Sequence, residues 1–421
     1  MKRRILFLIV LLALFAAPSS ARADVAPPEQ APGSNPEPTT GTTQVRMQAE
    51  TVLIEVQSGD PPKSLGSAHV TADFTMHNTG DAPESMAARF PIATDSGWGS
   101  VNFISDVRIR VAGKPVATRE ITGKDPAHEW STKEVPWAQF DVTFPAQQDL
   151  SIEVQYTVQA TGESPFSWFT YILSTGAGWK DTIGSIDIVV QLPYEANIEN
   201  VLPAVLTPNG RFDGNAIRWH YNDLEPTTRD NFIIRLVAPP LWQQLLAEQN
   251  NVALHPTDGE SWGRIGMLSK KMAFSSRRRG FRIGDHLDPG AEQLYQLALQ
   301  AYDKAVTLLP KDALWHAGYA DLLGYYAWWE GQNGTNTDAE AAHSISEIQI
   351  AKQLAPNDPQ VQDIAMEISL LFPDGQTPYQ LQAGRTATST LNAPTVGPTQ
   401  EAPSQATASP SPTVAPSPDP M

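Results

Sequence analysis

The spacing of apolar residues changes once along this chain, near Pro239, and this change constrains the fold more than any other feature. From Val45 to Pro239 apolar and polar residues alternate, as in VTADFTMHN, which places Val70, Phe74 and Met76 on one face. Such alternation is typical of strands with one buried face, and turn signals such as NTGD, AGKP and FDGN separate the strands. After Pro239 apolar residues recur at intervals of three and four, as in AEQLYQLALQAYDKAVTLLP, which predicts helices.

These two regions predict a multidomain β + α fold class. Strands without intervening helical segments indicate an antiparallel β-sandwich domain over 45–239 rather than a parallel sheet. One large sandwich is favoured over two in tandem, because no Pro/Ser-rich linker interrupts the region. A short all-α helical-repeat domain follows over 240–373. Residues 24–44 are rich in proline, glycine, threonine and acidic residues, and residues 374–421 in proline, serine and threonine, so we expect a disordered linker and a disordered tail there.

The first residues resemble a secretory signal peptide. Lys2, Arg3 and Arg4 precede an apolar run of 13 residues that ends at Ala17, and Ala21-Arg22-Ala23 offers a cleavage site. A run of this length is shorter than the roughly 20 residues that span a bilayer, and no spanning run follows it. The sequence therefore predicts a bacterial protein exported by a Sec-type signal peptide over 1–23, secreted or associated with the cell envelope, with no transmembrane segment after cleavage near Ala23.

Composition excludes several kinds of site and partner. The chain contains no cysteine, which excludes a lipoprotein anchor, disulfides and thiolate metal ligands. Its net charge of −17 becomes −21 after loss of residues 1–23, which hold four basic and no acidic residues, so nucleic acid is a poor partner. The basic cluster at 270–282 reads as a solvated loop, with an anion-binding patch as the alternative.

The helical region resembles the tetratricopeptide repeat over about 255–372. Trp262-x-x-Ile265-Gly266 is similar to the start of a first helix of that repeat, and Ala298, Tyr302, Ala305 and Pro310 match the small, aromatic, small and proline positions of a second helix. Pro310 and Pro356 mark a period of 46 residues, longer than the family's usual repeat. The resemblance implies stacked helical hairpins with a concave surface for a protein or peptide partner.

A second resemblance covers about 45–239. The segments SWFTYILSTGAGWKDTIGSIDIVVQLP and IRWHYNDLEPTTRDNFIIRLVAP resemble an exported bacterial β-sandwich family known as domain of unknown function 4424. This resemblance implies a fold and an extracytoplasmic setting. It implies no reaction and no catalytic residue.

No motif predicts a catalytic, cofactor or metal site. The segment STGAGWKDT lacks the spacing of a phosphate-binding P-loop and leads into a strand rather than a helix, so we interpret it as a connection between two strands. On one predicted strand, Asp73 lies about 13 Å from both His69 and His77, which is too far for these residues to chelate one ion. His128-Glu129 lacks the second histidine of a zinc protease helix.

Aromatic residues are the remaining candidates for ligand contact. Exposed rings at Trp130, Trp137, Trp168 and Trp179 in the strand region could stack on sugars, and the alternative is that they cap the core. In the helical region Tyr319, Tyr325, Tyr326 and Trp329 could line a partner groove or pack between the repeats.

The sequence thus predicts a non-catalytic exported protein that binds a protein or peptide or serves as a scaffold. The alternative is a cell-envelope protein that binds or processes carbohydrate through aromatic loops, with a polysaccharide as its partner.

Overall fold

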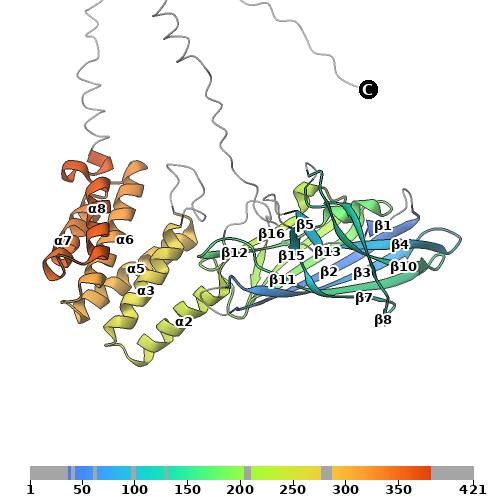
Figure 1. Cartoon of the computed structure of the whole chain (residues 1–421), viewed down its shortest axis with the longest axis horizontal. Coiled ribbons are helices and arrows are strands. Elements are labelled where there is room, and N and C mark those ends of the chain that lie inside the picture. The colour runs from blue at the N-terminus through green and yellow to red at the C-terminus, as the bar shows by residue number, and fades with distance from the viewer. Residues whose placement is uncertain are drawn as a thin grey trace, which may run out of the picture.

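A computed structural model describes residues 37–38, 43–59, 64–95, 101–128, 131–202, 210–275 and 287–380. Strands occupy one end of the elongated molecule and helices the other (Figure 1). The strands are β1 (Glu37–Pro38), β2 (Val45–Gln57), β3 (Ser67–Asn78), β4 (Glu84–Pro91), β5 (Ala93–Asp95), β6 (Val101–Phe103), β7 (Ser105–Val111), β8 (Lys114–Pro115), β9 (Arg119–Lys124), β10 (Glu134–Phe144), β11 (Asp149–Gln159), β12 (Phe166–Tyr171), β13 (Ile183–Gln191), β14 (Arg211–Asp213), β15 (Ala216–Leu224) and β16 (Phe232–Val237). The helices are α2 (Pro239–Leu254), α3 (Gly259–Phe274), α5 (Pro289–Leu308), α6 (Ala313–Gln332), α7 (Asp338–Leu354) and α8 (Pro359–Leu371), with 3-10 turns η1 (Ser174–Gly178), η2 (Thr228–Asp230) and η3 (Pro373–Gly375).

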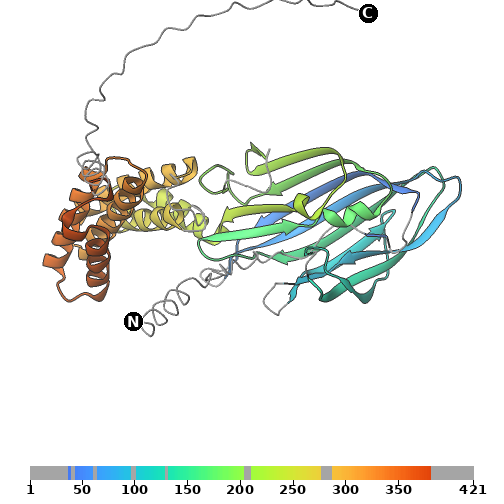
Figure 2. The same cartoon turned by 90° about the horizontal axis from the view of Figure 1, so that it is seen from above.

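The largest sheet has eight strands in the order β14-β15-β13-β2-β3-β11-β7-β8. A four-stranded sheet, β1-β4-β10-β9, and the pairs β12-β16 and β5-β6 complete the strand-rich part, which is seen from above in Figure 2. Strand β3 buries Val70, Ala72, Phe74 and Met76, as the alternation in the sequence predicts. These residues face the apolar core.

The predicted fold class, an antiparallel β-sandwich followed by an all-α domain, is wrong. The large sheet is mixed, because β13 pairs with β2 in parallel, with Ile188 opposite Val52. The apolar core is also continuous, running from the strands through Trp242 and Leu245 of α2 to Tyr295 of α5. Alternation reports which face of a strand is buried, but it carries no information about the direction of the neighbouring strand.

A β-bulge in β2 shapes the junction with β13. The register of β2 shifts between Met47 and Ala49, and the shift turns Glu50 into the core, where burial and the nearby Glu50 carboxylate raise the pKa of Tyr171 well above its ordinary value. A side chain at Gly184 of β13 would meet this bulge, because an added Cβ would lie 2.4 Å from the carbonyl oxygen of Gln48. Glycine at 184 therefore allows the two strands to approach each other.

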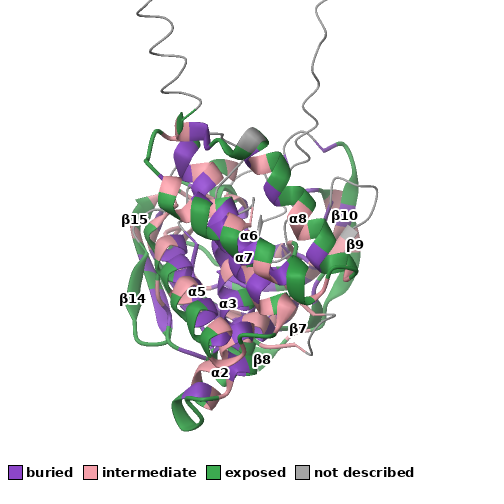
Figure 3. Ribbon diagram, turned by 90° about the vertical axis from the view of Figure 1, so that its left-hand side faces the viewer, coloured by how far each residue is buried: buried purple, intermediate pink, exposed green. Residues whose placement is uncertain are grey.

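The helices begin and end at recognisable signals. The side chains of Asp258, Asp288, Asp312 and Asp358 accept hydrogen bonds from backbone N–H groups at the starts of α3, α5, α6 and α8. Helices α5 and α7 end two residues before Pro310 and Pro356, as the sequence predicts. Buried and exposed residues recur along the helices, as Figure 3 shows. None of the described helices is long and apolar enough to cross a membrane.

Candidate functional site

A cleft of about 400 Å³ lies where the four-stranded sheet meets turns η1 and η2. Its cationic side chains are Arg89 of β4 and Lys124 of β9, and Trp137 of β10 forms part of its wall. The remaining lining residues are Asp125, Pro126, Ser174, Thr175, Ala177, Pro226, Thr227 and Thr228. The segment STGAGWKDT, predicted to connect two strands, does so through η1 between β12 and β13, and η1 also forms one wall of this cleft.

The position of Arg89 is fixed by its neighbours. Its guanidinium carbon lies 4.3 Å from the centroid of the Trp137 ring, which is the geometry of a cation–π contact. The indole Nε1 of Trp137 donates to the carbonyl oxygen of Lys124 at 3.2 Å, which orients the ring. A Cβ at Gly123 would lie 2.9 Å from both Arg89 Nη1 and Trp137 Nε1, so glycine is needed there for the guanidinium and the indole to lie against β9.

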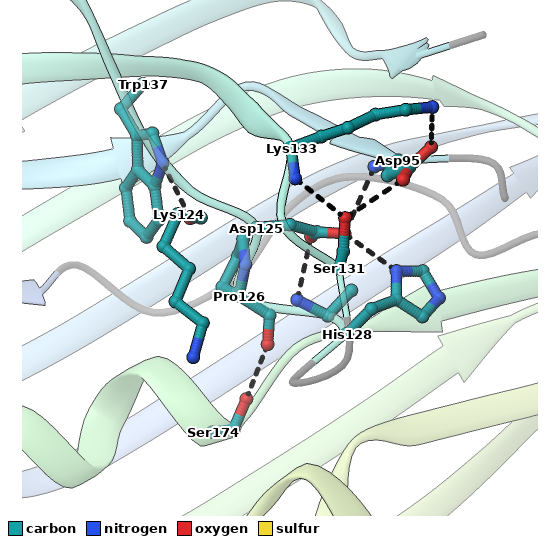
Figure 4. Close-up of polar contacts among 10 residues, drawn as sticks. Asp95, Lys124, Asp125, Pro126, His128, Ser131, Lys133, Trp137 and Ser174 are labelled. Atoms are coloured by element: carbon teal, nitrogen blue, oxygen red, sulfur yellow. Dashed lines mark hydrogen bonds and ion pairs between the residues drawn. The ribbon is translucent and has the colours of Figure 1, made fainter. Parts of the chain in front are cut away.

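A buried polar network lies beside the cleft (Figure 4). The carboxylate of Asp125, fully buried, lies 2.7 Å from Nδ1 of His128 and accepts from the backbone N–H of Ala127 at 3.0 Å. The carboxylate of Asp95 accepts from the Ser131 hydroxyl at 3.0 Å and pairs with Lys133 Nζ at 2.8 Å. Each buried carboxylate therefore has its own nitrogen partner, and the segment of Asp125 that lines the cleft is held in place.

The charge of the cleft differs from that of the whole chain. Asp125 is the one acidic residue among the described lining residues, and its carboxylate is occupied by His128 and the backbone. Lys124 is exposed, and in Figure 4 it extends toward η1 and Ser174. Two cations thus face a small hollow in a chain of net charge −17, an arrangement that suits a small anionic ligand.

The tryptophans predicted as sugar contacts are buried where the structure describes them, and they lie in different surroundings. Trp137 is 1 % exposed, Trp168 is 7 % exposed under Arg235, and Trp179 is 5 % exposed with its ring edge-on to Phe144. Trp130 lies outside the described residues. Of the three described rings, Trp137 alone lines the cleft, so they do not form one stacking surface.

The residues predicted to line a partner groove contact different helices. The ring of Tyr325, 38 % exposed, meets Phe274 of α3, and Tyr326 stacks on Tyr295 of α5 at 4.0 Å. Burial raises the pKa of Tyr326 to about 12. These four rings form one aromatic cluster between α3, α5 and α6.

Tyr319 and Trp329 lie outside that cluster. Tyr319 is 4 % exposed between Tyr302 of α5 and His343 of α7, and burial raises its pKa to about 12. Trp329 lies against Trp328, with 5.8 Å between ring centroids. The four predicted residues therefore do not line one common groove.

The histidines considered as metal ligands have other neighbours. Nδ1 of His77 lies 2.6 Å from Asp149 Oδ1, and His128 packs against Asp125. Within the described part of the chain, no group of three or more His, Cys, Asp or Glu residues is arranged to hold a metal ion.

Sequence reasoning missed most of this site. Arg89, Lys124 and Ser174 come from three segments separated by 35 to 85 residues, and no motif links them. The one local signal is the glycine-containing segment STGAG, which does not match a P-loop pattern and predicts only a turn. Only the folded chain brings it to Arg89 and Lys124.

Comparisons with known proteins identify no family. No protein-family model and no curated protein matches this chain. A solved Legionella pneumophila structure, provisionally described as a nutrient-binding protein, is 18 % identical with a TM-score of 0.41 over 65 % of this chain and 100 % of that chain. An M1 zinc metallopeptidase from Deinococcus radiodurans is 10 % identical with a TM-score of 0.27 over 85 % of this chain and 96 % of that chain. Both TM-scores are below 0.5, so neither similarity supports an inference about fold or function.

Proposed function

We propose that this chain is an exported, non-catalytic binding protein that holds a small anionic ligand in the cleft lined by Arg89 and Lys124. The observation that carries the proposal is the convergence of these two cationic side chains on one cleft whose single described carboxylate, Asp125, is already paired. An oxyanion, as found in carboxylates, phosphate and acidic sugars, is the ligand chemistry that such a pair of cations recognises.

The packing of Arg89 favours ligand binding. Its guanidinium is held over Trp137, so little side-chain entropy is lost when a ligand binds. A hydrogen bond to a charged group contributes about 1.5–3 kcal/mol, which corresponds to roughly a 10- to 150-fold gain in affinity.

Export and family membership belong to the same proposal. The signal peptide over 1–23, with cleavage near Ala23, would place the cleft outside the cytoplasm, secreted or in the cell envelope. The resemblance to domain of unknown function 4424 agrees with such a setting, and mass spectrometry of the mature N-terminus would test the cleavage site.

Isothermal titration calorimetry tests the cleft. The probes are inorganic phosphate, citrate and glucuronate, with glucose as the uncharged counterpart of glucuronate. At least one anion should bind, glucose should not, and Arg89→Gln or Lys124→Gln should lower affinity at least 10-fold. Lys114→Gln, an equal charge change on the exposed strand β8, is the control. Absence of anion binding, or equal affinity in Lys124→Gln and Lys114→Gln, would refute the proposal.

A protein or peptide partner for the helices is the second candidate. Its support is the outer face of α8, where Met366 and Leu370 are 58 % and 72 % exposed one turn apart, whereas a terminal capping helix ordinarily has a polar outer face. Peptides selected from a random library on the full chain should lose binding to the double variant Met366→Glu, Leu370→Glu. Selected peptides that bind the double variant as tightly as the parent chain would remove this support.

A further inference from the structure

A second hollow lies at the junction of strands and helices, separate from the cleft. It has a volume of about 280 Å³, and its walls come from the loop before β3, the loop before β12, the start of α2 and one face of α3. Its apolar lining includes Leu65, Leu241, Met267 and Leu268. This junction pocket is near the lower end of the size range of small-molecule sites.

The walls of the junction pocket are fixed by backbone contacts. The N–H of Ala238 donates to the carbonyl oxygen of Pro165 at 2.8 Å, and the N–H of Ala160 donates to that of Gly66 at 2.9 Å. Gly66 has φ of +99° and packs beside Pro239, where an added Cβ would lie 3.3 Å from the proline ring. The loops and the start of α2 are therefore held together without a ligand, and the pocket is preformed.

Polarity is arranged unevenly around the junction pocket. Leu268 is 3 % exposed and forms the inner wall, whereas Met267 is 45 % exposed at the opening. Lys271, the one charged lining residue among those described, is exposed one helical turn from Met267. The pocket thus combines an apolar interior with a cation at its mouth.

We propose that the junction pocket binds a medium-chain alkyl carboxylate, with its chain against Leu65, Leu241 and Leu268 and its carboxylate at Lys271. At roughly 30 Å³ for each atom-sized group, the pocket accommodates about ten heavy atoms, the size of octanoate. This inference does not depend on the anion cleft, since Arg89 and Lys124 do not line the pocket.

Chain length gives the first test. Each buried methylene should improve affinity about fourfold, so octanoate, with four more methylenes, should bind about 250-fold tighter than butyrate in calorimetry of the full chain. The heat capacity change of binding should be negative, as expected for buried apolar surface. Octanoate and butyrate binding equally, or octanoate not binding at millimolar concentration, would overturn the proposal.

Three variants separate the junction pocket from other anion sites. Met267→Trp places a larger side chain at the opening and should abolish octanoate binding, and the partial exposure of Met267 leaves room for the indole in the fold. Lys271→Gln should weaken octanoate binding about 10-fold while leaving octanol binding unchanged, and Lys352→Gln, at an exposed position of α7, is the matched control. Lys124→Gln should leave octanoate affinity unchanged.

The opposite result locates the ligand elsewhere. If Lys124→Gln weakens octanoate and Met267→Trp does not, octanoate binds in the anion cleft and the junction pocket proposal fails while the proposed function stands. If the probes phosphate, citrate and glucuronate fail to bind but octanoate shows the expected pattern at Met267 and Lys271, the proposed function fails and the pocket stands.

Discussion

Replacing Trp179 by alanine distinguishes a core residue from a sugar contact. The indole is 5 % exposed and meets the Phe144 ring edge-on, with 5.7 Å between centroids and 77° between planes. Removing a buried aromatic side chain costs about 3–5 kcal/mol, of which about 0.5–1.5 kcal/mol belongs to the aromatic pair. Because the core is continuous from the strands to the helices, roughly 330 residues unfold together, and at an unfolding entropy of about 2.1 cal/mol/K per residue Trp179→Ala should lower Tm by about 6 °C.

The measurement combines urea unfolding, calorimetry and retention on immobilised polysaccharide. Phe103→Ala is the control, because Phe103 is 59 % exposed and its removal should change the unfolding free energy by less than about 0.5 kcal/mol. If Trp179→Ala keeps the Tm of the parent chain but loses polysaccharide affinity, the core role is refuted and the ring is a ligand contact.

Two further substitutions test the packing of the sheet and the helices. Gly184→Ala should lower the unfolding free energy by about 3 kcal/mol in urea unfolding, because the new Cβ would lie 2.4 Å from the carbonyl oxygen of Gln48. Ser185→Ala in the same strand should lower it much less. Equal effects of the two substitutions would show that β2 can move away from β13. Burial lowers the pKa of Lys270 to about 8, against the opposing attraction of Glu367, although Lys270 pairs with Asp321 across α3 and α6. The folded chain therefore releases this proton between pH 8 and 10.5, where the unfolded chain keeps it. The unfolding free energy of the parent chain should therefore rise by about 2 kcal/mol relative to that of Lys270→Met between pH 7 and 9.5. A difference in unfolding free energy that is independent of pH would contradict the burial of the ammonium group.

The cleft illustrates which parts of a site a sequence reveals. The serine, threonine and glycines of STGAG were visible as a flexible polar turn, but nothing in the sequence placed Arg89 and Lys124 beside them. The sequence leaves open whether the tryptophans are exposed rings or cap the core, and the structure buries Trp137 and Trp179, because the residues that cover them come from distant segments. Exposure is a property of the assembled chain.

The sequence alone determined individual strands and helices and their buried faces. Alternation in β3 identified its buried face, and the apolar stripe that ends before Pro310 identified α5, because side-chain direction repeats every two residues in a strand and every 3.6 in a helix. Only the tertiary structure decided that β2 and β13 run parallel, that the core continues into α2 and that Arg89 faces η1. The parallel pairing and the cleft join residues more than 80 positions apart, and the free energy of such pairings lies in contacts that no local pattern records.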